Sequence, residues 1–226
     1  MISYFFRKFL FIFLFSVLGF AQETEFLFQP EIRLNYNPEN RWSFNFELTN
    51  RNILGDTDES GFEAQHLEFS HFTSYESGFY SKLSVGIRYR NRELFDSSNS
   101  DEFRLTQQYS YQPAYNDIRL GHRIRFEQRF YDDETVFRMR YRFGIDIPLR
   151  GLKLNNKEFY TAFTTETLYS LSKKSIPELD QRFTGSLGKK ISDGFKLQLS
   201  LEYRLENYLN DLNNRFFIYT TALIDI

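Results

Sequence analysis

Residues 122–147 read HRIRFEQRFYDDETVFRMRYRFGIDI. On both sides of Asp132 and Asp133, charged residues, mostly arginines, occupy every second position, and most positions between them are aromatic or aliphatic. A period of two is typical of a β-strand, because successive side chains point to opposite faces. The stretch therefore predicts two strands joined by a turn at the two aspartates, each with a charged face and an apolar face.

The same alternation recurs along the chain and predicts one all-β domain. Clear runs cover residues 42–49, 82–90, 103–111, 120–130, 137–147 and 195–206, and weaker runs cover 25–36, 62–75, 159–171, 181–191 and 215–226. Turn-forming sequences such as NPEN, DSSNSD and SDG separate the runs. These eleven runs, without a linker between them, indicate an antiparallel meander that closes into a β-barrel.

The number of strands follows from a rule for this class of protein. Bacterial barrels made from one chain have an even number of strands. We therefore expect ten or twelve strands rather than eleven, with one run assigned incorrectly. The two candidates are the first run, which Pro30 interrupts, and the poorly patterned residues 148–158.

The first residues have the pattern of a secretory leader. Arg7 and Lys8 precede an apolar segment, Phe9 to Val17, and Gly19-Phe20-Ala21 is a small-x-small cleavage pattern. This predicts a signal peptide at residues 1–21, cleaved after Ala21, and leaves residues 22–226 as a single outer-membrane β-barrel domain. An uncleaved anchor is the weaker alternative, because the apolar run is shorter than the roughly 20 residues of a spanning helix.

Composition excludes several functions. The 28 lysine and arginine residues are balanced by 30 acidic ones, giving a formal charge of −2, whereas a nucleic-acid-binding domain carries a basic excess. We therefore expect no nucleic-acid partner. The absence of cysteine excludes disulfides and thiolate metal sites. The three histidines (His66, His71 and His122) do not have H-E-x-x-H spacing, and no G-x-S-x-G motif occurs, so we expect no catalytic residue, metal site or cofactor.

Alternation alone does not say which face points inward. A soluble, secreted, lipocalin-like barrel buries its apolar face, whereas an outer-membrane barrel turns that face to lipid. Three features favour a transmembrane barrel in the cell outer membrane, in contact with its lipid. The runs are longer than the five or six residues of typical soluble strands. The polar faces mix arginine, glutamate and small residues, and tyrosine and phenylalanine recur near the ends of the runs.

Several motifs together resemble a known family. They are RWSFNFELTNR (41–51), HRIRFEQRF (122–130), RMRYRFGIDIPL (138–149), TTETLYS (164–170) and QRFTGSLGKKISDGFKLQLSLEYRLE (181–206). The most specific part is R-x-R-x-E-x-R followed by R-x-R-x-R. Over about residues 25–226 the chain resembles the outer-membrane barrel family catalogued as domain of unknown function 2490, which is frequent in Bacteroidota. The resemblance implies an outer-membrane β-barrel without an assigned activity, and it supplies no catalytic residues.

The candidate site is a lumen-facing charge cluster. It comprises Arg123, Arg125, Glu127, Arg129, Arg138, Arg140, Arg142, Glu47, Glu166, Glu202 and Arg204. A hairpin centred on Asp132-Asp133 places Glu127 opposite Arg138, a favourable ion pair. The same hairpin places Arg125 opposite Arg140 and Arg123 opposite Arg142, which are unfavourable like-charge pairs.

Two interpretations of these arginines remain open. In the first, acids on other strands (Glu31, Glu47, Glu166, Glu202 and Glu206) reach across a narrow lumen and neutralise them. In the second, the arginines form a constriction that binds or selects a small anionic solute. We expect a barrel with a structural or narrow transport role and favour neutralisation. A lipid-modifying outer-membrane enzyme is an alternative function, and nothing in the sequence indicates an oligomeric state.

Overall fold

The computed structural model describes residues 24–56, 59–92, 95, 100–115 and 118–226, so the predicted signal peptide lies outside the described residues. The described part is built from strands. They are β1 (Thr24–Tyr36), β2 (Trp42–Asp56), β3 (Glu59–Gly78), β4 (Ser81–Asn91), β5 (Glu102–Tyr111), β6 (Ala114–Tyr115), β7 (Ile118–Phe130), β8 (Thr135–Pro148), β9 (Phe159–Leu171), β10 (Glu178–Ser192), β11 (Phe195–Glu206) and β12 (Asn213–Asp225). In these ranges no helix is long and apolar enough to cross a membrane.

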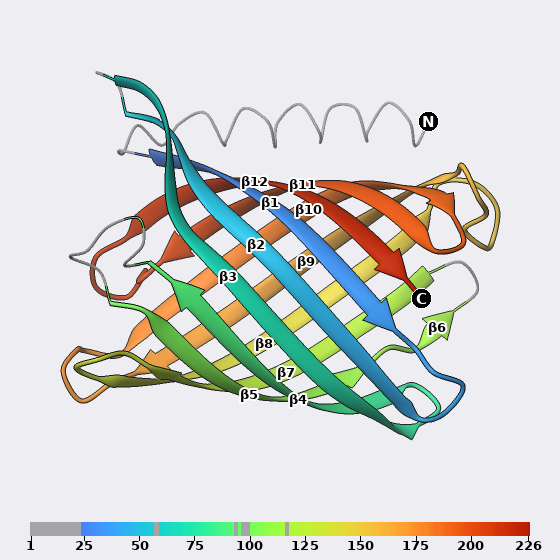
Figure 1. Ribbon diagram of the computed structural model, residues 1–226, viewed down its shortest axis with the longest axis horizontal. Helices are drawn as coiled ribbons and strands as arrows, with labels where there is room; N and C mark the ends of the chain where they lie inside the picture. Colours follow the sequence, from blue (N-terminus) through green and yellow to red (C-terminus); the bar gives the residue numbers. More distant parts are fainter. Residues whose placement is uncertain (1–23, 57–58, 93–94, 96–99, 116–117) are drawn as a thin grey trace, which may run out of the picture.

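The strands form a closed barrel (Figure 1). Each long strand pairs antiparallel with the next along the chain, with β5 pairing directly with β7. The two-residue β6 pairs only with the start of β7. The ring closes where β1 pairs with β12, and this pairing is parallel. We call the end where β1 begins the N-terminal rim and the end where β12 finishes the C-terminal rim.

Among the described residues the wall contains eleven long strands, with the two-residue β6 beside β7, so the expected count of ten or twelve is not confirmed. In an up-and-down meander with an odd number of strands, the first and last strands run in the same direction. Such a barrel can close only through one parallel pair, as β1 and β12 do here. All eleven sequence runs correspond to strands, including the run that contains Pro30. Proline has no N–H to donate to a neighbouring strand. In the pairing of β1 with β2, Phe28 and Glu31 have partners, and Gln29 and Pro30 between them do not.

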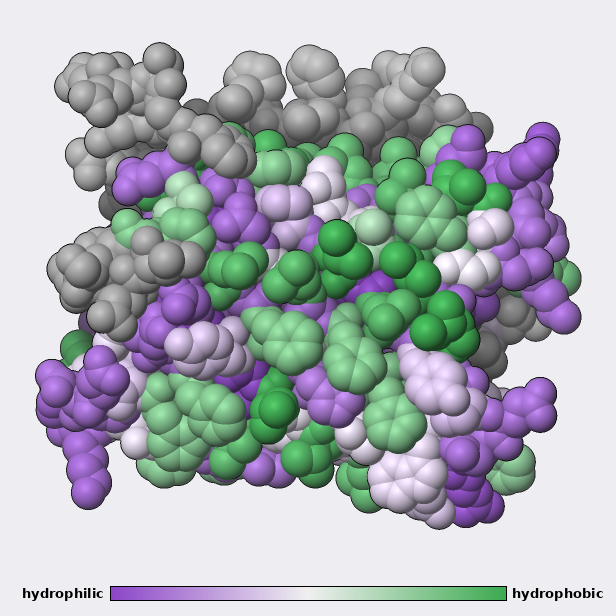
Figure 2. All heavy atoms as spheres, in the orientation of Figure 1, coloured by the Kyte–Doolittle hydropathy of each residue, from purple (hydrophilic) through white to green (hydrophobic). Residues whose placement is uncertain are grey.

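Polar side chains are buried, and apolar side chains are exposed. Five hydrophobic residues are buried among those described, whereas the buried polar and charged side chains include Glu102, Glu127 and Arg140. Large apolar residues on alternate positions, such as Phe126 and Met139, point outward and are exposed. On the face that Figure 2 shows, hydrophobic residues gather across the middle of the molecule, and hydrophilic residues lie toward both ends. This distribution is the reverse of that in a soluble domain.

The parallel closure is packed from inside by an apolar pair. Leu27 of β1 and Phe217 of β12 are in register, and each is 1% exposed. The guanidinium carbon of Arg204 lies 3.6 Å from the centre of the Phe217 ring, and that of Arg51 lies 5.0 Å from it. The ring therefore packs against two cations as well as Leu27, and these contacts link β1, β2, β11 and β12.

Gly86 on β4 provides a test of packing inside the barrel. It is in register with Phe72, and a Cβ atom at Gly86 would lie 2.4 Å from the Phe72 ring. The Arg125 guanidinium carbon lies 5.1 Å from the centre of that ring. Because the ring must move, we expect Gly86→Ala to lower the free energy of unfolding by about 1–3 kcal/mol, the range for overpacked sites, as measured by urea titration.

Gly121→Ala is the matched control for this prediction. The nearest atom to a Cβ atom at Gly121 is a backbone oxygen 3.9 Å away, which is ordinary van der Waals contact. Equal destabilisation by the two substitutions would contradict the steric explanation.

Candidate functional site

A cavity of about 1230 Å³ lies inside the barrel. Its lining includes Asn35, Gln112 and Arg119 near the C-terminal rim, and it includes Arg92, Glu178 and Arg215 near the N-terminal rim. One continuous cavity therefore has lining residues close to both ends of the barrel.

Among the described residues of the lining, arginine is present and lysine is not. The sixteen arginines are Arg33, Arg51, Arg88, Arg90, Arg92, Arg104, Arg119, Arg123, Arg125, Arg129, Arg138, Arg140, Arg142, Arg182, Arg204 and Arg215. The eight acids of the lining are Glu31, Glu47, Glu68, Asp146, Glu178, Asp180, Glu202 and Glu206. Three further buried acids, Glu102, Glu127 and Glu166, form ion pairs with lining arginines. Cations therefore outnumber anions around the cavity.

The strand register places arginines directly opposite one another. Six such pairs occur: Arg88–Arg104, Arg104–Arg129, Arg123–Arg142, Arg125–Arg140, Arg182–Arg204 and Arg204–Arg215. Like charges opposite each other destabilise a sheet. A structural role alone does not explain why the interior concentrates them.

Near the N-terminal rim, one buried carboxylate forms ion pairs with four arginines. Glu102, which is 1% exposed, lies 2.5 Å from Arg104, 2.8 Å from Arg129, 3.3 Å from Arg90 and 3.5 Å from Arg92 (N to O). The Tyr131 hydroxyl also donates to it at 3.1 Å. A buried charge is stable only when it is paired and hydrogen-bonded, and Glu102 meets both conditions.

A second group of ion pairs lies on the wall formed by β7, β8 and β9. Glu166 lies 2.5 Å from Arg140, 3.1 Å from Arg142 and 3.3 Å from Arg123. Glu127 lies 2.9 Å from Arg140 and 3.7 Å from Arg125. Glu127 also lies 3.7 Å from Arg104 on the adjacent strand β5, so both acids contact arginines of their own or nearby strands.

The remaining acids form separate groups. Glu47 pairs with Arg33 at 2.9 Å and Arg88 at 3.4 Å; Glu31 also contacts Arg33. Glu202 pairs with Arg204 at 2.6 Å and accepts hydrogen bonds from Thr184 and Tyr219, each at 2.9 Å. Glu206 pairs with Arg204 and Arg215.

The structure places nine of the eleven predicted cluster residues in the cavity lining. They are Arg123, Arg125, Arg129, Arg138, Arg140, Arg142, Glu47, Glu202 and Arg204. The other two, Glu127 and Glu166, are almost fully buried beside the arginines. The register predicted for the hairpin is confirmed, with Glu127 opposite Arg138, Arg125 opposite Arg140 and Arg123 opposite Arg142.

Two expectations about charge pairing are wrong. Glu127 pairs with Arg140 and Arg125 rather than with Arg138, which donates to Ser170 at 2.7 Å and lies 4.0 Å from Asp180.

The second error concerns the acids that were expected to reach across the lumen. Of these, only Glu166 contacts arginines of the β7–β8 hairpin, and it comes from the neighbouring strand. The ion pairs of Glu31, Glu47, Glu202 and Glu206 are instead with Arg33, Arg88, Arg204 and Arg215. Residues next to each other in the sheet are closer than residues across the cavity, so adjacent acids form the pairs.

Three buried acids were missed, Glu102, Glu68 and Asp180. Glu68 pairs with Arg88 at 2.8 Å and with Arg90 at 2.6 Å. Extending the alternation of the run at 103–111 by one residue would have placed Glu102 on the same face as Arg104. Alternation within β3 likewise places Glu68 on the inner face with His66, which is buried.

The three histidines lie apart. His66 is buried, whereas His71 packs against Phe46 and hydrogen-bonds Thr73, and His122 hydrogen-bonds the Tyr141 hydroxyl. Within the ranges given above, no group of three or more His, Cys, Asp or Glu residues could hold a metal ion.

The model of a family described as protein of unknown function (DUF2490) matches residues 30–215. A search of curated proteins finds no match to this chain.

Proposed function

The chain belongs to the DUF2490 family of proteins of unknown function, and we propose that it is an outer-membrane β-barrel whose arginine-lined interior is a narrow passage for small anions. The observation that carries the proposal is the cavity with lining residues near both rims, in which arginines outnumber carboxylates. The support for the membrane and the support for the anion are independent of each other.

Strand length and outward residues support the membrane. A strand that crosses a bilayer at a steep tilt needs about 9–11 residues, and every strand of the closed wall has at least 10. The wall is closed, so no edge would present unpaired backbone groups to lipid. Most outward side chains at mid-strand are apolar, such as Val85 and Leu199, and the outward polar residues Gln107 and Gln128 hydrogen-bond each other.

Aromatic residues toward the two rims support the same proposal. Exposed Tyr36, Trp42, Tyr80 and Tyr111 lie toward the C-terminal rim, and exposed Phe26, Tyr89, Phe103 and Phe130 lie toward the N-terminal rim. Aromatic rings at these depths are typical of the two membrane–water interfaces of outer-membrane barrels. A soluble lipocalin-like barrel would instead keep its large apolar side chains inside.

Arginine accounts for the proposed preference for anions. Its guanidinium stays protonated at any physiological pH, and a cavity lined by one sign of charge raises the local concentration of the opposite ion. The acids offset only part of this charge, because the eight acids of the lining and the three buried beside it are fewer than the sixteen arginines. Anions are therefore expected to enter more readily than cations.

Planar-bilayer recording of the purified protein in a potassium chloride gradient tests the passage. We expect current that reverses near the chloride equilibrium potential. Arg51 has no carboxylate within ion-pair distance among the described residues and donates to Gln29, so Arg51→Gln should weaken anion selectivity without leaving an acid unpaired. Arg150→Gln, in the β8–β9 connection, is the control and should leave the anion selectivity unchanged. Cation-selective current, or a membrane that stays silent with correctly folded protein, would contradict the proposal.

A further inference from the structure

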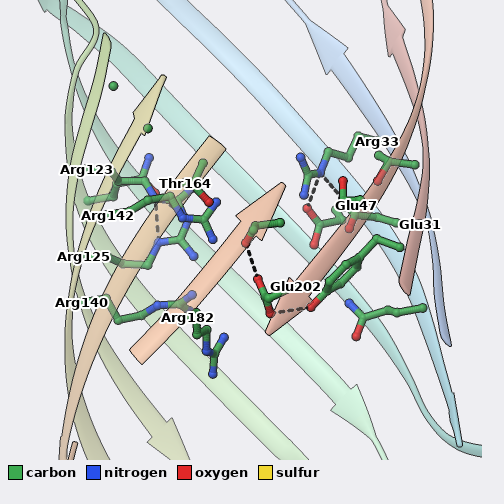
Figure 3. A pocket seen from close by; sticks show the side chains of 18 of the residues that line it. Glu31, Arg33, Glu47, Arg123, Arg125, Arg140, Arg142, Thr164, Arg182 and Glu202 are labelled. Atoms are coloured by element: carbon green, nitrogen blue, oxygen red, sulfur yellow. Dashed lines mark hydrogen bonds and ion pairs between the residues drawn. The ribbon is translucent and has the colours of Figure 1, made fainter. Parts of the chain in front are cut away.

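The geometry points to a binding site for a multivalent oxyanion, phosphate or a phosphate monoester, on the cavity wall formed by β7, β8, β9 and β10. Five arginines make the site: Arg123, Arg125, Arg140, Arg142 and Arg182. Figure 3 shows them gathered on one side of the cavity around Thr164. This inference rests on the proposed function and deepens it, because it names the class of anion and the place in the cavity where that anion binds.

The wall carries uncompensated positive charge. The acids within ion-pair distance of these five arginines are Glu127 and Glu166. Two carboxylates cannot balance five guanidinium groups, and the excess is larger than a single monovalent anion neutralises. A ligand with two or more negative charges fits this excess.

Hydrogen-bond donors on the wall lack partners. The Nε atoms of Arg123 and Arg182 are buried and make no hydrogen bond within the described structure. Arg182 also has no carboxylate within 4 Å among those residues, although its register partner on β9 is Glu166. A buried donor without a partner costs free energy, and an oxyanion in front of the wall would accept from such groups.

The guanidinium donors on this wall suit the oxygen atoms of a tetrahedral oxyanion. The planar guanidinium presents a fork of N–H donors that matches the oxygens of phosphate, and arginine forms such pairs bidentately. Lysine, a compact point charge, does not occur among the described residues of the lining. Chloride has no set of oxygens to engage several forks at once.

The acids across the cavity from this wall belong to balanced ion pairs. In Figure 3, Glu31 and Glu47 on β1 and β2 face the five arginines across the open space. Glu31 and Glu47 are paired with Arg33 and Arg88, so these two acids and two arginines balance each other and leave no excess of positive charge like that of the five-arginine wall. The site is therefore one-sided, against β7 to β10.

Thermal unfolding and calorimetry of the purified, detergent-solubilised barrel test the site, with inorganic phosphate as the probe at constant ionic strength. We expect phosphate and sulfate to bind saturably and to raise the unfolding midpoint, and acetate and chloride to have little effect. Arg182→Gln should weaken phosphate binding about tenfold or more, the scale of one lost charge-assisted hydrogen bond. This substitution leaves no acid unpaired, so the variant should fold at least as well as the parent without phosphate. Arg123→Gln provides a second variant on the same wall.

Arg51→Gln is the matched control, because Arg51 also lines the cavity without a carboxylate partner but lies on β2. It should retain phosphate binding. Equal weakening by Arg51→Gln and Arg182→Gln, equal binding of acetate, or no saturable phosphate binding would overturn the site. Phosphate binding that depends on Arg182 in a barrel that conducts no anions would retain the site and reject the passage. Anion current without phosphate binding would retain the passage and reject the site.

Discussion

Replacing Glu102 by glutamine should lower the free energy of unfolding by about 3–5 kcal/mol, the scale for breaking a buried ion pair. Glu102 is almost fully buried and pairs with four arginines. Glutamine has nearly the same shape but no charge. The substitution therefore leaves the guanidinium groups close together without the anion between them, and urea titration of the refolded barrel measures the loss.

Glu76→Gln is the control for this prediction. Glu76 pairs with Lys82 at 3.2 Å, and both side chains are well exposed. An exposed pair contributes only about 0–1 kcal/mol, so the same chemical change should have little effect there. A loss below about 1 kcal/mol for Glu102→Gln, in the range of an exposed pair, would show that Glu102 does not hold the arginines together.

Phe217→Ala is expected to destabilise the barrel by about 3–5 kcal/mol, the range for truncating a buried aromatic residue. Phe217 contacts Arg204 and Arg51 at the closure and is in register with Leu27. Removing its ring leaves a cavity at the one parallel pairing of the wall. Urea titration measures the loss, and hydrogen exchange of β1 and β12 amides should increase before that of β7 and β8.

Phe79→Ala makes the same truncation at a fully exposed turn residue and should leave stability within about 0.5 kcal/mol. The account of the closure would be contradicted if both phenylalanine variants had the same small effect. It would also be contradicted if Phe217→Ala opened all strands equally.

Alternation in the sequence is enough to predict most of the fold. Each run corresponds to one strand because a period of two has a single structural meaning. The pairing of β7 with β8 followed from one turn at Asp132-Asp133, because the turn fixes which residues are opposite each other. The positions of Arg123, Arg125, Arg140 and Arg142 were therefore predictable.

Closure and charge pairing were not predictable in the same way. An odd number of strands makes the first and last strands run in the same direction, but nothing local to β1 or β12 signals a parallel pair. Which residues form an ion pair depends on how far each side chain extends toward its neighbours. An arginine can extend to several acids, as Arg140 does to Glu127 and Glu166, so the strand register alone does not give the partner. The arginines of β8 pair with Glu166 rather than with Glu47, because Glu166 lies on β9, the strand next to β8 in the sheet. Glu102 was missed because it lies one residue before the apolar pattern begins.

Single-cysteine labelling in lipid vesicles tests the central claim most directly, and the absence of native cysteine makes every label specific. The outward positions are Phe126 and Tyr141, which are exposed, and the inward positions are Thr164 and Ser200, which line the cavity. We expect a lipid-soluble thiol probe to label cysteines at 126 and 141, and a small water-soluble reagent to label cysteines at 164 and 200. The opposite labelling pattern, or recovery of the folded chain as a soluble protein without vesicles, would contradict a membrane barrel with an arginine-lined interior.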